Sequence, residues 1–135
     1  VNDPKMLPSI LNKLYHALDY ALTAWLRFER NKGKIRAYED SFESKLALFR
    51  QELLPKYKLK LDTALFLQEI RNLVLDHERT AVEFSRKEKL VMVENSQVSM
   101  LDEQKLKAFL SKTKVFIEEV RRKVRTHLLA EEQRT

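Results

Sequence analysis

Apolar residues recur at steps of three and four along most of this chain, and that spacing places them on one face of a helix. A first stripe begins after Pro8 and ends before Gly33, whose freedom to adopt a positive φ suits a helix end. The stripe consists of Leu11, Leu14, Leu18, Leu22, Trp25 and Phe28. The pattern predicts one long opening helix.

Three further stretches have the helical period: residues 40–54, 61–75 and 101–130. Pro55 is expected to stop the second of them, because proline lacks the backbone N–H that an α-helix uses. The stretch 61–75 is apolar almost all round, so it is predicted to lie in the middle of a bundle. The polar residues 76–80 follow it, and the helix is expected to fray there.

Between residues 81 and 99 the helical period is lost. Residues 90–93 form a β-like run, Asn95-Ser96 is a turn signal, and residues 97–99 can return beside the run. The sequence therefore predicts an all-α, up-and-down bundle of about four long helices, with a short irregular or β-hairpin insert before the last helix. Residues 1–135 are expected to form a single domain, and the start at Val1 is compatible with excision from a longer chain.

Composition adds a charge preference and several exclusions. The net charge of +6 favours polyanionic partners such as RNA, although a solvated surface rich in lysine and arginine gives the same balance. The absence of cysteine excludes disulfides and thiolate metal sites and suits a reducing compartment, so a cytoplasmic location is expected. No apolar run reaches the length of a membrane span, so no membrane partner is expected.

Catalytic motifs are scarce. A single glycine excludes glycine-rich phosphate loops, and three scattered histidines give no metal-ligand spacing, so no metal or cofactor is expected. The remaining group is Arg71, Asn72 and His77. Arginine can clamp a phosphate, histidine can take a proton from a ribose 2′-hydroxyl or return one to a leaving oxygen, and asparagine can orient either group. These are the parts that metal-free RNA cleavage needs.

The spacing of this group constrains its geometry. A step of six residues turns the chain by about 600°, which leaves Arg71 and His77 roughly 120° apart on an ideal helix. They converge only if the helix ends before His77 or if a second subunit supplies part of the site. Asp76 and Glu78 flank the histidine, and their carboxylates favour the protonated imidazole but repel a phosphate.

The segment from Ile70 to His77 resembles the R-(x4–6)-H motif of HEPN domains, in the form in which a polar residue follows the arginine. The opening segment Tyr15-His16-Ala17-Leu18-Asp19-Tyr20-Ala21-Leu22 and the long closing helix fit the layout of that family. The resemblance implies a helical bundle that dimerises with the two motifs facing each other. It also implies metal-independent endoribonuclease activity, as in bacterial toxins and phage-defence effectors, with Arg71 and His77 catalytic and Asn72 supporting.

The resemblance further implies RNA as substrate, a homodimer with a composite site, and an antitoxin or a fused domain as an additional partner. Basic residues in the connector after Pro55, beside the motif and in the last helix are candidates for contacting RNA. They are Lys56, Lys58, Lys60, Arg79, Arg121, Arg122, Lys123 and Arg125.

Two other interpretations use the same residues. In the first, the chain is a non-catalytic helical module that binds RNA or a protein. In the second, the site is purely structural: Arg71 pairs with one of the nearby acids Glu69, Asp76 or Glu78 inside the bundle, and His77 caps the helix.

Overall fold

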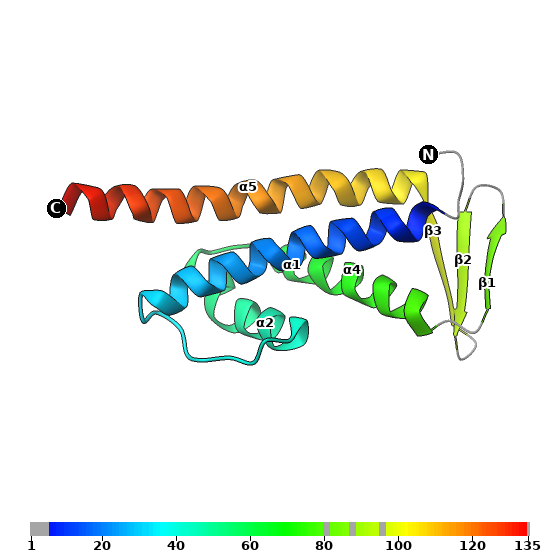
Figure 1. Ribbon diagram of the computed structural model, residues 1–135, viewed down its shortest axis with the longest axis horizontal. Coiled ribbons are helices and arrows are strands. Elements are labelled where there is room, and N and C mark those ends of the chain that lie inside the picture. The colour runs from blue at the N-terminus through cyan, green and yellow to red at the C-terminus, as the bar shows by residue number, and fades with distance from the viewer. Residues whose placement is uncertain (1–5, 80–81, 87–88, 95–96, 135) are drawn as a thin grey trace.

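Three long helices form the body of the protein: α1 (Leu7–Asn31), α4 (Leu61–Arg79) and α5 (Glu103–Arg134). Figure 1 shows α1 and α5 side by side, both running away from a small sheet, and α4 running back toward it. The computed structural model describes residues 6–79, 82–86, 89–94 and 97–134, with side-chain surroundings for residues 6–78 and 101–125. The predicted helical bundle is confirmed.

The opening helix follows its apolar stripe closely. Leu18, Leu22 and Trp25 are completely buried, because the stripe faces the other helices. Gly33 ends the helix in the left-handed region with φ of 69°, and its N–H donates to the carbonyl oxygen of Arg30 at 2.9 Å. Both the stripe and its glycine stop are as the sequence predicts.

The second helical stretch is built from three pieces: α2 (Phe42–Leu48), the π-helical turn η2 (Phe49–Leu53) and the short α3 (Leu54–Lys56). Ser41 caps its start, since the Ser41 hydroxyl accepts a hydrogen bond from the Ser44 N–H at 3.1 Å. A serine at this position satisfies a backbone donor that the first turn otherwise leaves without a partner.

The prediction that Pro55 ends this stretch is wrong, because the helix continues through it to Lys56. The physical reason lies one residue earlier, where the Leu54 N–H donates to the Phe49 carbonyl in the wider π pattern. Pro55 then falls in the first turn of α3, where a backbone N–H is not needed. The chain leaves the helix at Lys58, which has a positive φ of 53°.

Helix α4 differs from its predicted form in two ways. It does not fray at Asp76 but remains helical to Arg79, so His77 lies in the last described turn of the helix. It is also not covered on all sides, because Leu61 and Leu65 are about half exposed. The buried side of α4 faces α1, and the open side continues the molecular surface.

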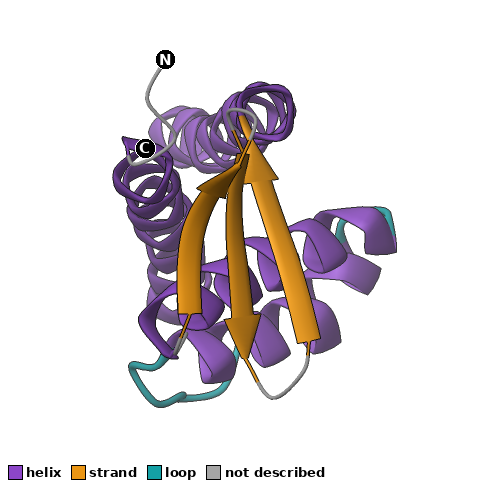
Figure 2. Ribbon diagram, turned by 90° about the vertical axis from the view of Figure 1, so that its right-hand side faces the viewer, coloured by secondary structure: helices purple, strands orange, loops and turns teal. Residues whose placement is uncertain are grey.

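The insert between α4 and α5 is a three-stranded antiparallel sheet in the order β1-β2-β3 (Figure 2). Strands β2 (Lys89–Glu94) and β3 (Gln97–Asp102) form the hairpin that the sequence predicts. Strand β1 (Val82–Arg86) adds a third strand that the prediction lacked, with Val82 opposite Val93. The sheet closes one end of the bundle and carries the chain from α4 into α5.

Aromatic side chains fill the centre of the bundle. The ring of Trp25 lies 5.6 Å from that of Phe49 and 6.3 Å from that of Phe116, and the last two rings lie 5.9 Å apart. These edge and tilted contacts join α1, η2 and α5 in one core. They fix the positions of the surface helices that carry the candidate site.

Candidate functional site

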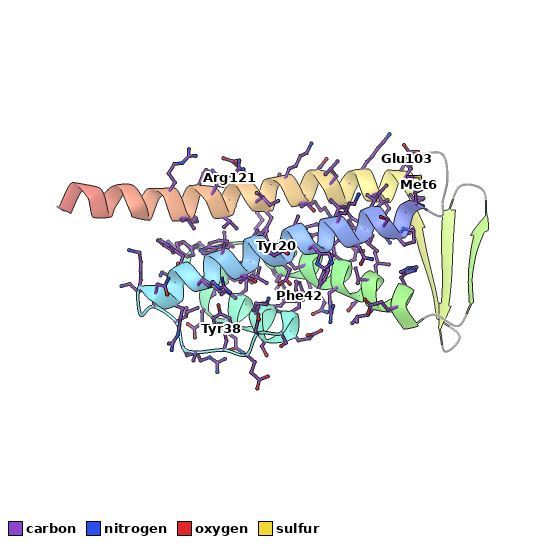
Figure 3. All side chains as sticks on the ribbon, in the orientation of Figure 1. Met6, Tyr20, Tyr38, Phe42, Glu103 and Arg121 are labelled. Atoms are coloured by element: carbon purple, nitrogen blue, oxygen red, sulfur yellow. The ribbon has the colours of Figure 1, made fainter. Side chains whose placement is uncertain are left out.

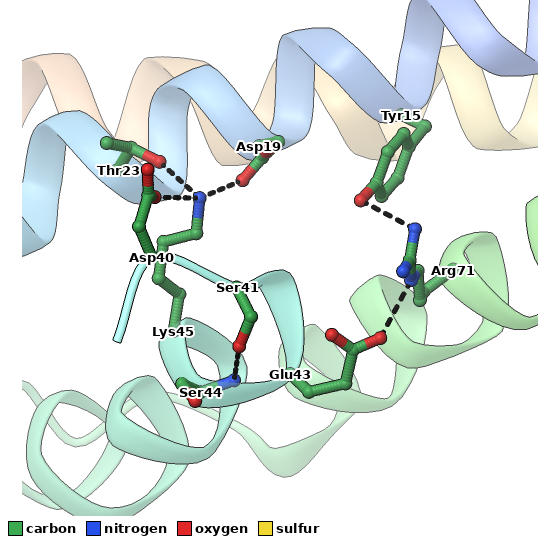
Figure 4. A network of polar contacts seen from close by, with 9 residues as sticks. All are labelled: Tyr15, Asp19, Thr23, Asp40, Ser41, Glu43, Ser44, Lys45 and Arg71. Atoms are coloured by element: carbon green, nitrogen blue, oxygen red, sulfur yellow. Dashed lines mark hydrogen bonds and ion pairs between the residues drawn. The ribbon is translucent and has the colours of Figure 1, made fainter. Parts of the chain in front are cut away.

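Arg71 lies where α1, α2 and α4 meet, and side chains from all three helices hold it (Figure 4). Its Nη1 donates to the Tyr15 hydroxyl at 2.9 Å, and its Nε donates to Glu43 Oε1 at 3.0 Å. The guanidinium carbon lies 5.3 Å from the centre of the Tyr15 ring and 5.9 Å from that of Phe42. Two hydrogen bonds and two aromatic rings therefore fix one cation in place.

The two partners of Arg71 differ in burial. Tyr15 is 8% exposed, whereas the side chain of Glu43 is 58% exposed and that of Arg71 is 20% exposed. An ion pair with one partner so open to water contributes little, about 0.2–1 kcal/mol. The more firmly held contact of Arg71 is therefore the one with the tyrosine, and the ion pair with Glu43 adds little.

Tyr15 is a neutral phenol in this setting. Burial raises the pKa of Tyr15, the Arg71 charge acts in the opposite direction, and the carboxylates of Asp19 and Glu43 raise it further, so the net shift is upward. The phenol oxygen accepts the hydrogen bond from Arg71, and the phenol keeps its own proton to donate. Tyr15 therefore supplies a second donor beside the guanidinium.

Asn72 is exposed beside Arg71 on α4. Its Oδ1 accepts a hydrogen bond from Gln68 Nε2 at 3.0 Å, one helical turn earlier. This bond uses the acceptor of the Asn72 amide, so its two N–H donors are directed away from Gln68. Adjacent positions on a helix lie about 100° apart, so the Asn72 amide and the Arg71 guanidinium point to different sides of α4.

His77 does not join this group within one chain. Because α4 continues to Arg79, the step of six residues places His77 about 9 Å farther along the axis and roughly 120° around the helix from Arg71. His77 is half-buried, with Asp76 half-buried and Glu78 exposed on either side. The first condition for convergence, an early end of the helix, is not met, so a single protomer holds the two halves of the motif apart.

The interpretation of Arg71 as a structural residue also needs a different acid partner. The acid that meets Arg71 is Glu43, which lies 28 residues away in the sequence, whereas the nearby acids Glu69, Asp76 and Glu78 were the expected partners. The pair joins α4 to α2 at the surface and not inside the bundle.

The connector lysines fall into two groups. Lys56 Nζ is 2.7 Å from Glu29 Oε2, and this carboxylate is only 1% exposed. Lys58 and Lys60 are exposed and stand at the start of α4. Lys56 therefore neutralises a buried acid, and only the other two remain candidates for contacting RNA.

The basic cluster on α5 is largely matched by acids on the same helix, and Figure 3 shows Arg121 on the side of α5 that faces away from α1. Arg121 approaches Glu118 at 3.9 Å, Lys123 approaches Glu119 at 3.4 Å, and Arg122 also pairs with Glu119. Pairs at steps of three and four stabilise a helix modestly and reduce its field for a polyanion. Arg125 is exposed, and the side chain of Arg79 lies outside the described residues.

Sequence reasoning missed a buried lysine beside the candidate site. Lys45 on α2 is 4% exposed, and its Nζ lies 2.7 Å from Asp19, 3.0 Å from Thr23 and 3.4 Å from Asp40 (Figure 4). Burial lowers the pKa of Lys45, but the hydrogen bond and charge of Asp19, helped by Asp40, outweigh it and raise the pKa overall. The sequence did contain a signal for this burial, because Lys45 lies three residues after Phe42 and four before Phe49, on the apolar face of the second helical stretch.

A groove of about 860 Å³ runs along another side of α4, between it and α5. Its apolar lining includes Leu65, Phe66, Val115 and Phe116. Arg71 does not line this groove, so the groove and the Arg71 site are separate features of the surface.

Within the part of the chain that the structure describes, no set of three or more metal-binding side chains gathers at one point. No described helix has both the length and the apolar character to cross a membrane. No protein-family model matches the chain, and searches of curated proteins and of solved structures returned no significant match.

Proposed function

We propose that this chain is a metal-independent endoribonuclease of the HEPN type, acting as a homodimer in which Arg71 of one protomer meets His77 of the other. The observation that carries the proposal is the state of Arg71. Its guanidinium is positioned by the Tyr15 hydroxyl and by the rings of Tyr15 and Phe42, while its carboxylate partner Glu43 is open to water. A preoriented arginine with an exchangeable partner suits a phosphodiester.

The proposed reaction needs one base and one cation. The neutral imidazole of His77 takes the proton from the ribose 2′-hydroxyl, and the 2′-oxygen forms a bond to the adjacent phosphorus. The bond from phosphorus to the 5′-oxygen breaks, and that oxygen receives the proton back from the His77 imidazolium. Arg71 stabilises the charge that builds on the phosphoryl oxygens, and Asn72 orients the ribose or the phosphate. The products carry a 2′,3′-cyclic phosphate and a free 5′-hydroxyl.

The proposed reaction calls for a dimer, and the geometry of α4 supports this part of the proposal. Arg71 and His77 point about 120° apart on one continuous helix, so a scissile phosphate cannot meet both in one protomer. A two-fold axis beside α4 would bring the arginine of one copy to the histidine of the other.

Subunit mixing tests this arrangement directly. Purified protein should cut single-stranded RNA in EDTA and leave cyclic-phosphate ends. Arg71→Ala and His77→Ala should be inactive, while the matched controls Arg36→Ala and His127→Ala remain active. If the two inactive variants are mixed and allowed to exchange subunits, half of the dimers are mixed and each has one intact site, so about a quarter of wild-type activity should return.

The outcomes separate the alternatives. No recovery on mixing, with both variants folded and dimeric, would contradict the composite site. RNA left intact by a folded wild-type dimer would contradict the nuclease itself. Growth arrest on expression, relieved by His77→Ala, would support the toxin or phage-defence setting, in which an antitoxin or a fused domain restrains the enzyme in the cytoplasm.

A non-catalytic RNA-binding module is the second candidate. It is favoured by the divergence of Arg71 and His77 within one chain and by the acids beside His77, which disfavour an approaching phosphate. This candidate predicts salt-dependent RNA binding that Arg71→Ala weakens, with no cleavage and no effect of His77→Ala.

A further inference from the structure

The carboxylate of Glu43 occupies the side of Arg71 that a phosphodiester would need. Glu43 Oε1 accepts from Arg71 Nε at 3.0 Å, as a phosphate oxygen would. The other contacts of Arg71, with the Tyr15 hydroxyl and the rings of Tyr15 and Phe42, do not involve this carboxylate. Removing Glu43 from the pair would therefore leave the guanidinium in place.

Glu43 is well situated to leave. It lies in the first turn of α2, which Ser41 caps, and its side chain is 58% exposed. Rotation about its own side-chain bonds would carry it into water without moving the helix backbone. The ion pair itself contributes little at this exposure, so breaking that pair takes only a small free energy.

The other acids nearby are already engaged. Asp19 and Asp40 both meet Lys45, at 2.7 Å and 3.4 Å, and Figure 4 shows this group beside the Arg71 group. Since Lys45 neutralises these two carboxylates, Glu43 is the described acid that meets the Arg71 guanidinium within ion-pair distance.

We propose that Glu43 is an internal substitute for the RNA phosphate: it holds the place of a phosphodiester on Arg71 in the free protein and is displaced when RNA binds. This inference rests on the proposed function for its ligand, and it names the residue that regulates access to the site. Glu43 is a regulating residue here and takes no part in the cleavage, since the RNA phosphate displaces it on binding.

Binding and cleavage are measured separately to test it. In the His77→Ala background, where RNA stays intact, Glu43→Gln should tighten the binding of a short single-stranded RNA about two- to fivefold, the range that an exposed ion pair supplies. Glu52→Gln is the matched control, because Glu52 is an exposed glutamate on the same helical stretch and loses the same charge. It should change binding much less.

A double-mutant cycle identifies the partner. With Arg71→Ala present, Glu43→Gln should give no further gain in binding. Equal gains from both glutamine variants, a gain that persists without Arg71, or weaker binding by Glu43→Gln would each overturn the inference. The inference would also be overturned if neither the Glu43→Gln nor the Glu52→Gln variant bound RNA at low salt. Tightened binding without any cleavage by the wild type would instead remove the nuclease and leave the Glu43 inference standing.

Discussion

Replacing Arg71 by alanine should leave the protein folded, and the structure allows the loss of stability to be worked out. The hydrogen bond to Tyr15 contributes about 0.5–1.5 kcal/mol, and the pair with the exposed Glu43 contributes about 0.2–1 kcal/mol. Stacking on two rings at a partly exposed site adds about 0.5–1 kcal/mol. These contributions overlap, so we expect a loss of about 2 kcal/mol in the free energy of unfolding.

Urea unfolding followed by far-ultraviolet circular dichroism measures that loss, and thermal melting checks it. For a domain of this size a loss of 2 kcal/mol corresponds to a fall in Tm of roughly 6–10 °C. Lys45→Ala is the internal comparison, because it removes a buried cation and its charge-assisted hydrogen bonds to Asp19 and Thr23, and it should cost more, about 3 kcal/mol.

Which of the two variants loses more free energy of unfolding distinguishes a structural role of Arg71 from a ligand-binding role. If Arg71→Ala costs as much as Lys45→Ala, Arg71 is a structural residue, and the assignment of a ligand to it fails. If Arg71→Ala costs clearly less, loss of RNA cleavage or binding in that variant can be read as a loss of function rather than of fold.

Two further changes test the fold around the site. Burial and the Glu29 carboxylate raise the pKa of Tyr57 in the folded protein. The neutral phenol of Tyr57 therefore contributes its full stability below a pH of about 10, the pKa in the unfolded chain, and this contribution is lost as the pH rises toward the folded pKa. Tyr57→Phe should flatten the decline of Tm between pH 9 and pH 11, and an unchanged decline would contradict this. Gly33→Ala should cost about 1 kcal/mol because of the positive φ alone, since a Cβ there would meet no atom within 4 Å, and a neutral result in urea unfolding would show that the helix end relaxes.

The long helices could be predicted from the sequence because each buries one continuous stripe, and the stripe is a local pattern. The end of α4 could not be found in this way. Residues 76–79 are polar, which suggests fraying, yet glutamate and arginine have good helix propensity and continue a helix wherever it faces water. A change from apolar to polar residues marks where a helix leaves the core, and this need not be where it ends.

Strand β1 has only a short signal in the sequence. Val82 and Phe84 alternate with Glu83 and Ser85, which is the period of a strand, but two apolar residues make a weak pattern. The neighbouring hairpin was easier to predict because its turn signal lies between two β-like runs.

The surroundings of Arg71 lay beyond what the sequence could supply. Its two hydrogen-bond partners, Tyr15 and Glu43, are 56 and 28 residues away, and no local pattern couples such positions. The motif could therefore name Arg71 as a candidate, but only the packing of α1 and α2 against α4 determines what it meets.

The contrast between Arg71 and Lys45 bears on what the Arg71 site is for. Lys45 is buried and holds α2 against α1 through Asp19, as expected of a structural group, whereas Arg71 joins α4 to α1 and α2. Arg71 has a firm neutral partner in Tyr15 and an ionic partner that is open to water. Burial of both members would make the pair costly to break, so an exposed Glu43 is a poor way to secure a fold. Under the proposed function, it would keep the arginine oriented and neutralised until an RNA phosphate replaces the carboxylate.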